Sequence, residues 1–167
     1  MQLNSSAELV SDVNDIIGNS VKDPQTIRYV TNLLLSPPIA GMKEIRLNFQ
    51  VGIDSEFFEL KLMGLKDTGD KCLVTGIFYL DQIFRRDNSA SYMLLDLGRT
   101  SYNIAGVYAS VTGQDGDYNV FSELSERFIP VVAELSYRMR RRLGDLNPPE
   151  RIVMQTPYGD RLLISNQ

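Results

Sequence analysis

The feature that most constrains the fold is a change in hydrophobic periodicity at Lys43. Beyond this residue, Ile45, Leu47, Phe49 and Val51 alternate with polar residues. A period of two places apolar side chains on one side of an extended chain and is typical of a half-buried strand. The sequence therefore predicts that a helical N-terminal part gives way to a β-sheet near Lys43.

Two helices are predicted before this change, over about residues 5–36. Asp23 is a suitable cap for the second helix, with Pro24 at its first position, and the pair Pro37-Pro38 ends it. Behind them, residues 43–111 carry five strand-like runs separated by polar or glycine-containing turn signals. These runs cover residues 43–51, 58–62, 72–84, 92–97 and 104–111.

A long helix is predicted over about residues 119–143, with a break near Phe128-Ile129 because Pro130 removes an amide donor. The preceding segment 112–117 has loop composition, and residues 151–165 read as a terminal hairpin. The order is ααβββββαββ. Short turns between consecutive strands require antiparallel pairing.

The predicted class is therefore α+β: a mainly antiparallel sheet of about five to seven strands, with two N-terminal helices and one long helix packed on it. The 167 residues fit a single domain spanning 1–167, which can bury a core without a disulfide or a structural metal.

Composition restricts the chemistry. The chain has no histidine, no tryptophan and one cysteine, so histidine-based catalysis and most transition-metal sites cannot be assembled. Cys72 lies in an apolar run and is expected to be an inert buried thiol. We therefore expect no catalytic residues, no metal and no cofactor. A histidine-free enzyme using carboxylates and tyrosines is the least favoured alternative.

Location and charge give weaker expectations. No window is long and apolar enough for a membrane span and no secretion signal is evident, so we expect a cytoplasmic protein. A net charge of −4 argues against a dedicated nucleic-acid-binding protein, although a local basic face could still bind an anion.

Two groups of residues are candidate contact sites. The apolar, proline-containing exit from the second helix could bind a protein partner, although packing into the chain's own core is the better expectation. Its candidate residues are Leu33, Leu34, Leu35, Pro37, Pro38 and Ile39. An arginine cluster could contact an anionic partner, although a solvated helix end is favoured. Its candidates are Arg138, Arg141 and Arg142, with Arg85 and Arg86.

No group of carboxylates has a spacing that predicts a metal site or acid–base chemistry. The loop residues Asp115 and Asp117 lack the further oxygen ligands of a calcium loop. The pairs Glu56 with Glu59 and Asp81 with Asp96 do not differ in spacing from solvated acids.

The leading hypothesis is a non-catalytic protein-interaction module, such as an adaptor, chaperone or assembly subunit, that self-associates as a homodimer. Nucleic-acid binding through the arginines is the second.

Overall fold

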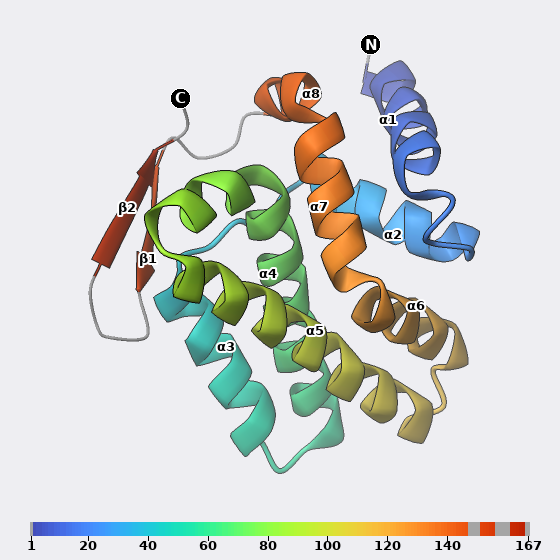
Figure 1. Cartoon of the computed structure of the whole chain (residues 1–167). Helices are drawn as coiled ribbons and strands as arrows, with labels where there is room; N and C mark the ends of the chain where they lie inside the picture. Colours follow the sequence, from blue (N-terminus) through green and yellow to red (C-terminus); the bar gives the residue numbers. More distant parts are fainter. Residues whose placement is uncertain (1, 147–150, 156–160, 166–167) are drawn as a thin grey trace.

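Eight helices and one two-stranded sheet make up the part of the chain that the structure, a computed structural model, describes: residues 2–146, 151–155 and 161–165 (Figure 1). In chain order they are α1 (Gln2–Ile17), α2 (Pro24–Leu35), α3 (Met42–Asp54), α4 (Phe58–Arg86), α5 (Asn88–Val111), α6 (Asp115–Glu126), α7 (Phe128–Arg138), α8 (Arg140–Asp145), β1 (Arg151–Gln155) and β2 (Arg161–Ser165). The predicted α+β sheet of five to seven strands is wrong, because residues 43–111 form three helices.

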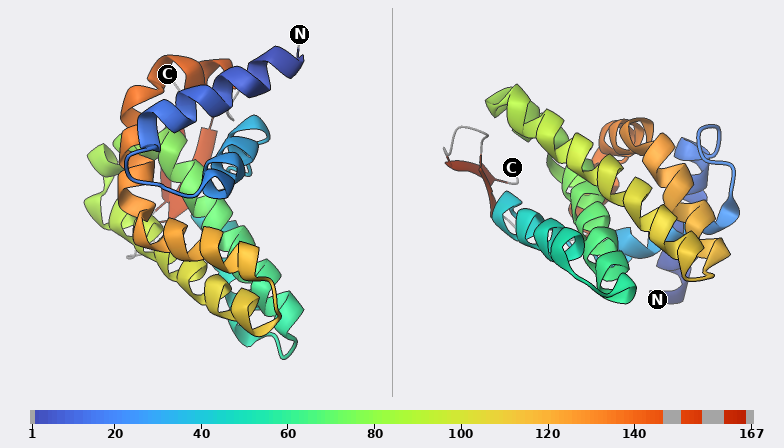
Figure 2. Two further views of the ribbon diagram at one scale, coloured as in Figure 1. Left: turned by 90° about the vertical axis from the view of Figure 1, so that its right-hand side faces the viewer. Right: turned by 90° about the horizontal axis from the view of Figure 1, so that it is seen from below.

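Helix α4 is the centre of the molecule. It packs against α3, α5 and α7, and it also contacts α2 and β2. Figure 2 shows α3 at the edge of the molecule, with α4 between it and the greater part of α5. The core is one cluster of buried apolar side chains drawn from all of these elements.

The alternating run of residues 43–51 belongs to α3 and is not a strand. Ile45 is fully buried and Phe49 packs against the core, whereas Leu47 and Val51 are exposed. Residues four apart lie on one side of a helix, so the alternation reflects two apolar helix faces. The period of two arose because both faces carry large apolar residues.

The predicted strands and turns of residues 58–84 form the single helix α4. Its glycines mark close helix packing instead of turns: a Cβ on Gly64 would lie 2.8 Å from the Cα of Gly52 in α3. A Cβ on Gly69 would lie 2.7 Å from the ring of Tyr102 in α5. Small residues at these positions let the helices approach each other.

The predicted strands 92–97 and 104–111 are likewise one helix, α5, which continues through the polar segment between them. Gly98, within that segment, is buried, and a Cβ there would overlap the ring of Phe128 and lie 2.7 Å from Cβ of Cys72. The segment therefore forms the crossing of α5 with α4 and α7.

The other predicted helices agree better with the structure. Helices α1 and α2 match the expected pair, and the Asp23 side chain accepts a hydrogen bond from the backbone N–H of Gln25. The single long helix over 119–143 is divided into α6, α7 and α8, with the first break at Arg127, next to the expected position. Pro130 lies in the first turn of α7, where no intrahelical donor is needed.

The terminal hairpin is confirmed by β1 and β2, which pair antiparallel; the predicted turn at 156–160 lies outside the described residues. Ile152, Met154 and Ile164 are buried, and the register pair Val153 and Leu163 faces outward.

The segment 112–117 is a loop only as far as α6, which begins at Asp115. None of the helices in the described part of the chain combines the length and apolarity needed to span a bilayer.

Candidate functional site

A buried polar cluster joins three helices. Asp70, in the middle of α4, is 4% exposed. The hydroxyl groups of Tyr29 from α2 and Tyr102 from α5 each donate to Oδ1 of Asp70 at 2.6 Å. Nζ of Lys66 lies 3.2 Å from Oδ2 of the same carboxylate. Both oxygens of this buried charge are therefore satisfied, as burial requires.

The electrostatics of the cluster favour a structural role. Burial raises the pKa of Asp70, while the Lys66 charge and the tyrosine hydrogen bonds oppose that rise. Burial, together with the Asp70 charge, raises the pKa of Tyr29 and of Tyr102, so both keep the protons that they donate. None of these residues lines either of the pockets described below. The cluster therefore holds α2, α4 and α5 together.

The predicted arginine cluster is divided between two helices, because α7 ends at Arg138 and α8 begins at Arg140. Arg140 forms an ion pair with Asp81 of α4. Nε of Arg142 lies 3.1 Å from Oδ2 of Asp12 in α1. Two of the four arginines thus join α8 to other parts of the same chain.

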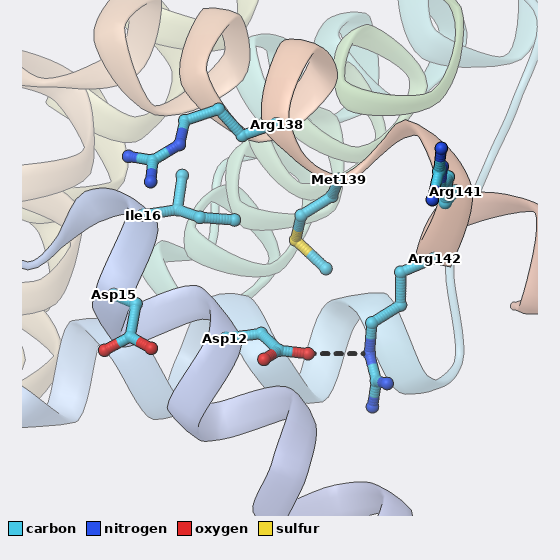
Figure 3. Close-up of a pocket in the computed structure, with 7 residues that line it drawn as sticks. All are labelled: Asp12, Asp15, Ile16, Arg138, Met139, Arg141 and Arg142. Atoms are coloured by element: carbon cyan, nitrogen blue, oxygen red, sulfur yellow. Dashed lines mark ion pairs between the residues drawn. The ribbon is translucent and has the colours of Figure 1, made fainter.

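Arg138, Arg141 and Arg142 line a pocket of about 240 Å³ between α1 and the α7–α8 junction. Asp12 and Asp15 line the same pocket. In Figure 3 the three guanidinium groups point in different directions, with only that of Arg142 directed at Asp12. The pocket therefore has mixed charge and no point on which the cations converge.

The other two predicted arginines, Arg85 and Arg86, are exposed in the last turn of α4 and do not line this pocket. Cations at that end of a helix interact favourably with its dipole. Their position is thus explained by local helix stability.

The exit from α2 packs largely into the protein. Leu34 is fully buried, and Leu33 and Ile39 pack against the core. Leu35 is 41% exposed, and Pro37 and Pro38 are partly buried. Of the six candidate partner-binding residues, Leu35 exposes the largest apolar surface.

The carboxylates Asp81 and Asp96 have separate ion-pair partners. Asp81 pairs with Arg140, and Asp96 pairs with Arg99 on its own helix. Asp115 and Asp117 lie in the first turn of α6, where they suit the helix dipole. Glu56 precedes α4 and Glu59 lies in its first turn; both are exposed. Within the described residues, no three acidic or thiol side chains are grouped to hold a metal ion.

Cys72 is fully buried where α4 meets α5, and burial raises its thiol pKa.

A second pocket, of about 540 Å³ and mostly apolar, is open to solvent. It is lined by Tyr92, Met93, Leu95, Asp96 and Arg99 of α5 and by Ile129 of α7.

An exposed apolar surface on α3 and α4 was not predicted. Leu47 and Val51 of α3 are 59% and 57% exposed, and Leu60 and Met63 of α4 are 42% and 53% exposed. We call these four residues the α3–α4 apolar face.

Helical geometry places the four residues on one side of the helix pair. The close approach of Gly52 and Gly64 fixes which sides of α3 and α4 meet, and Arg46 reaches Met93 on the side of α3 nearest α5. At about 100° per residue, the α3–α4 apolar face is turned away from α5 on both helices. Leu47 and Val51 are also the residues that produce the strand-like alternation in the sequence. That alternation was the sequence signal from which this exposed face could have been found.

Comparisons of the chain with protein-family models, with curated proteins and with solved structures found no match.

Proposed function

We propose that the protein is a non-catalytic protein-interaction module, acting as an adaptor, a chaperone or a subunit of a larger assembly, and that the α3–α4 apolar face is its contact surface. One observation carries this proposal. Leu47, Val51 and Met63 are large apolar side chains, each more than half exposed, on one side of an adjacent helix pair.

Folding does not require these side chains to be apolar. The core side of α3 is supplied by Met42, Ile45 and Phe49. Burying apolar surface against a partner gains about 25 cal/mol per Å², whereas leaving it in water gains nothing. A group of exposed large apolar side chains on one side of a helix pair is therefore best explained by a partner that covers it.

Nucleic-acid binding through the arginines stays the second proposal and has less support. Arg140 and Arg142 are engaged with Asp81 and Asp12, and the guanidinium groups at the α7–α8 junction do not converge. A phosphate backbone requires several cations on one surface.

Site-specific photo-cross-linking tests the contact surface. A photoreactive residue is placed at Val51 or, as a matched control, at Val107 of α5, which is similarly exposed at 54%. The cross-linked products are then analysed in cells that make the protein. We expect a covalent adduct with another protein chain, whether a copy of this one or a different protein, from position 51 and not from 107.

Failure to form an adduct at position 51, or equal adducts at both positions, would contradict the proposal. The cytoplasmic location stays a prediction from the sequence, and fractionation of the same cells tests it.

A further inference from the structure

Helix α3 carries a stripe whose two ends have opposite charge. Lys43, Leu47, Val51 and Asp54 are spaced by four, four and three residues, which places them along one side of the helix. All four are exposed, Lys43 near the N-terminal end and Asp54 at the C-terminal end. We call these four residues the α3 stripe.

The α3 stripe faces away from the rest of the molecule. Helix α3 contacts α4 and β1, and its packing residues are on the opposite side: Ile45 is fully buried and Gly52 meets Gly64. Figure 2 shows α3 at the edge of the helical array. A second helix can therefore lie along the stripe without displacing a described element.

The α3 stripe is complementary to a second copy of itself that lies antiparallel to it. If two copies of α3 lie antiparallel about a two-fold axis between Leu47 and Val51, each Leu47 faces Val51 of the other copy. The same symmetry places each Lys43 opposite Asp54 of the other copy, so the dimer contains two such charge pairs. A parallel arrangement would instead bring Lys43 to Lys43 and Asp54 to Asp54, which like-charge repulsion disfavours.

We propose that the partner of this surface is a second copy of the same chain, bound through antiparallel contact between the two α3 stripes. The inference rests on the proposed function and names the partner. The apolar pair in the centre supplies the burial, and the charges at the ends set the direction and register, because exposed ion pairs contribute little affinity. Asp54 also accepts a hydrogen bond from Gln50, one turn earlier on the same helix.

Sedimentation equilibrium of the purified full chain is the first test. We expect a monomer–dimer equilibrium, and Val51→Glu should raise the dimer dissociation constant about thirtyfold or more because it places a charge in the apolar centre. Val107→Glu is the matched control, since Val107 has the same side chain and similar exposure on α5. This variant should leave the constant unchanged.

Charge reversal is the second test and is specific to the antiparallel register. Lys43→Glu or Asp54→Lys alone should raise the dissociation constant about tenfold, because each creates two like-charge contacts. The double variant should restore it. Residues 43 and 54 are eleven positions apart on one helix and cannot contact each other within a chain. Rescue would therefore come from contacts between chains.

Neither reversal should impair folding, because a glutamate near a helix N-terminus and a lysine at its C-terminus both suit the dipole. Circular dichroism provides that check. A monomer at about 100 μM, a dimer unaffected by Val51→Glu, or absence of rescue in the double variant would each overturn the inference. An adduct of Val51 with a different protein, together with a monomeric purified chain, would overturn this inference and leave the proposed function standing.

Discussion

Asp70 is a carboxylate in a core position, and its hydrogen bonds account for its presence there. A charge so deeply buried is tolerated because Tyr29, Tyr102 and Lys66 satisfy both of its oxygens. The cluster also explains why the sequence 66–71 was misread as a turn. Its polar residues resemble a loop, whereas Asp70 and Lys71 bond to other helices and Lys66 and Thr68 bond within α4.

The Asp70→Asn variant is expected to change the pH dependence of stability. Because burial raises the pKa of Asp70 on folding, the folded protein keeps a proton that the unfolded chain releases as the pH rises through the ordinary aspartate pKa of 3.8. This contribution to stability is complete below that value and is lost as the pH rises through the folded pKa. Relative to the wild type, Asp70→Asn should therefore become more stable as the pH rises.

Urea unfolding of the two proteins at several values between about pH 4 and pH 7 measures this difference. The remaining carboxylates are common to both proteins, so their contributions cancel. A difference in the free energy of unfolding that stays constant with pH would contradict the expectation.

At the scale of elements, the sequence predicted helices best where caps and prolines mark their ends. Asp23 and Pro24 identified α2, and Pro130 indicated the break near α7, because these residues act through local backbone geometry. The hairpin strands were also recognisable from local pattern. Helices α3, α4 and α5 were not, because their pattern depends on contacts distant in sequence.

Glycine was the main source of the error in α4 and α5. Gly64, Gly69 and Gly98 resemble turn residues in the sequence, yet each lies where another helix comes so close that a Cβ would collide with it. In α3 the error had another source, since Leu47 and Val51 added an exposed apolar face that the core does not need. The residues that made α3 resemble a strand, Leu47 and Val51, thus also belong to the unpredicted α3–α4 apolar face.

The glycine explanation predicts opposite effects for two Gly→Ala substitutions in α5. Gly98→Ala should destabilise the protein by about 1–3 kcal/mol or more, because its methyl group overlaps Phe128 and Cys72. Gly106→Ala is the matched control. Its nearest neighbouring atom would be 3.6 Å away, so the higher helix propensity of alanine should stabilise α5 by up to about 1 kcal/mol.

Chemical denaturation of both variants measures these differences. Equal effects of the two substitutions would show that the close approach at Gly98 does not determine helix packing.

At the scale of the whole molecule, association through α3 would couple stability to concentration. A dimer that forms only from folded chains stabilises them by mass action, so the melting temperature should rise by about 2 °C for each tenfold increase in protein concentration. Val51→Glu should reduce this dependence over the same concentrations, and Val107→Glu should retain it. Calorimetry over a hundredfold range of concentration, about 2 μM to 200 μM, makes the comparison. A melting temperature independent of concentration in the wild type would contradict association.

The position of Cys72 has a practical consequence. It is the one thiol of the chain, and it lies sealed at the crossing of the central helices. A thiol reagent reacts with the accessible thiolate, so the folded protein should resist alkylation until this crossing opens. The rate at which the native chain is alkylated therefore reports how often its centre opens, and no cysteine has to be introduced for the measurement.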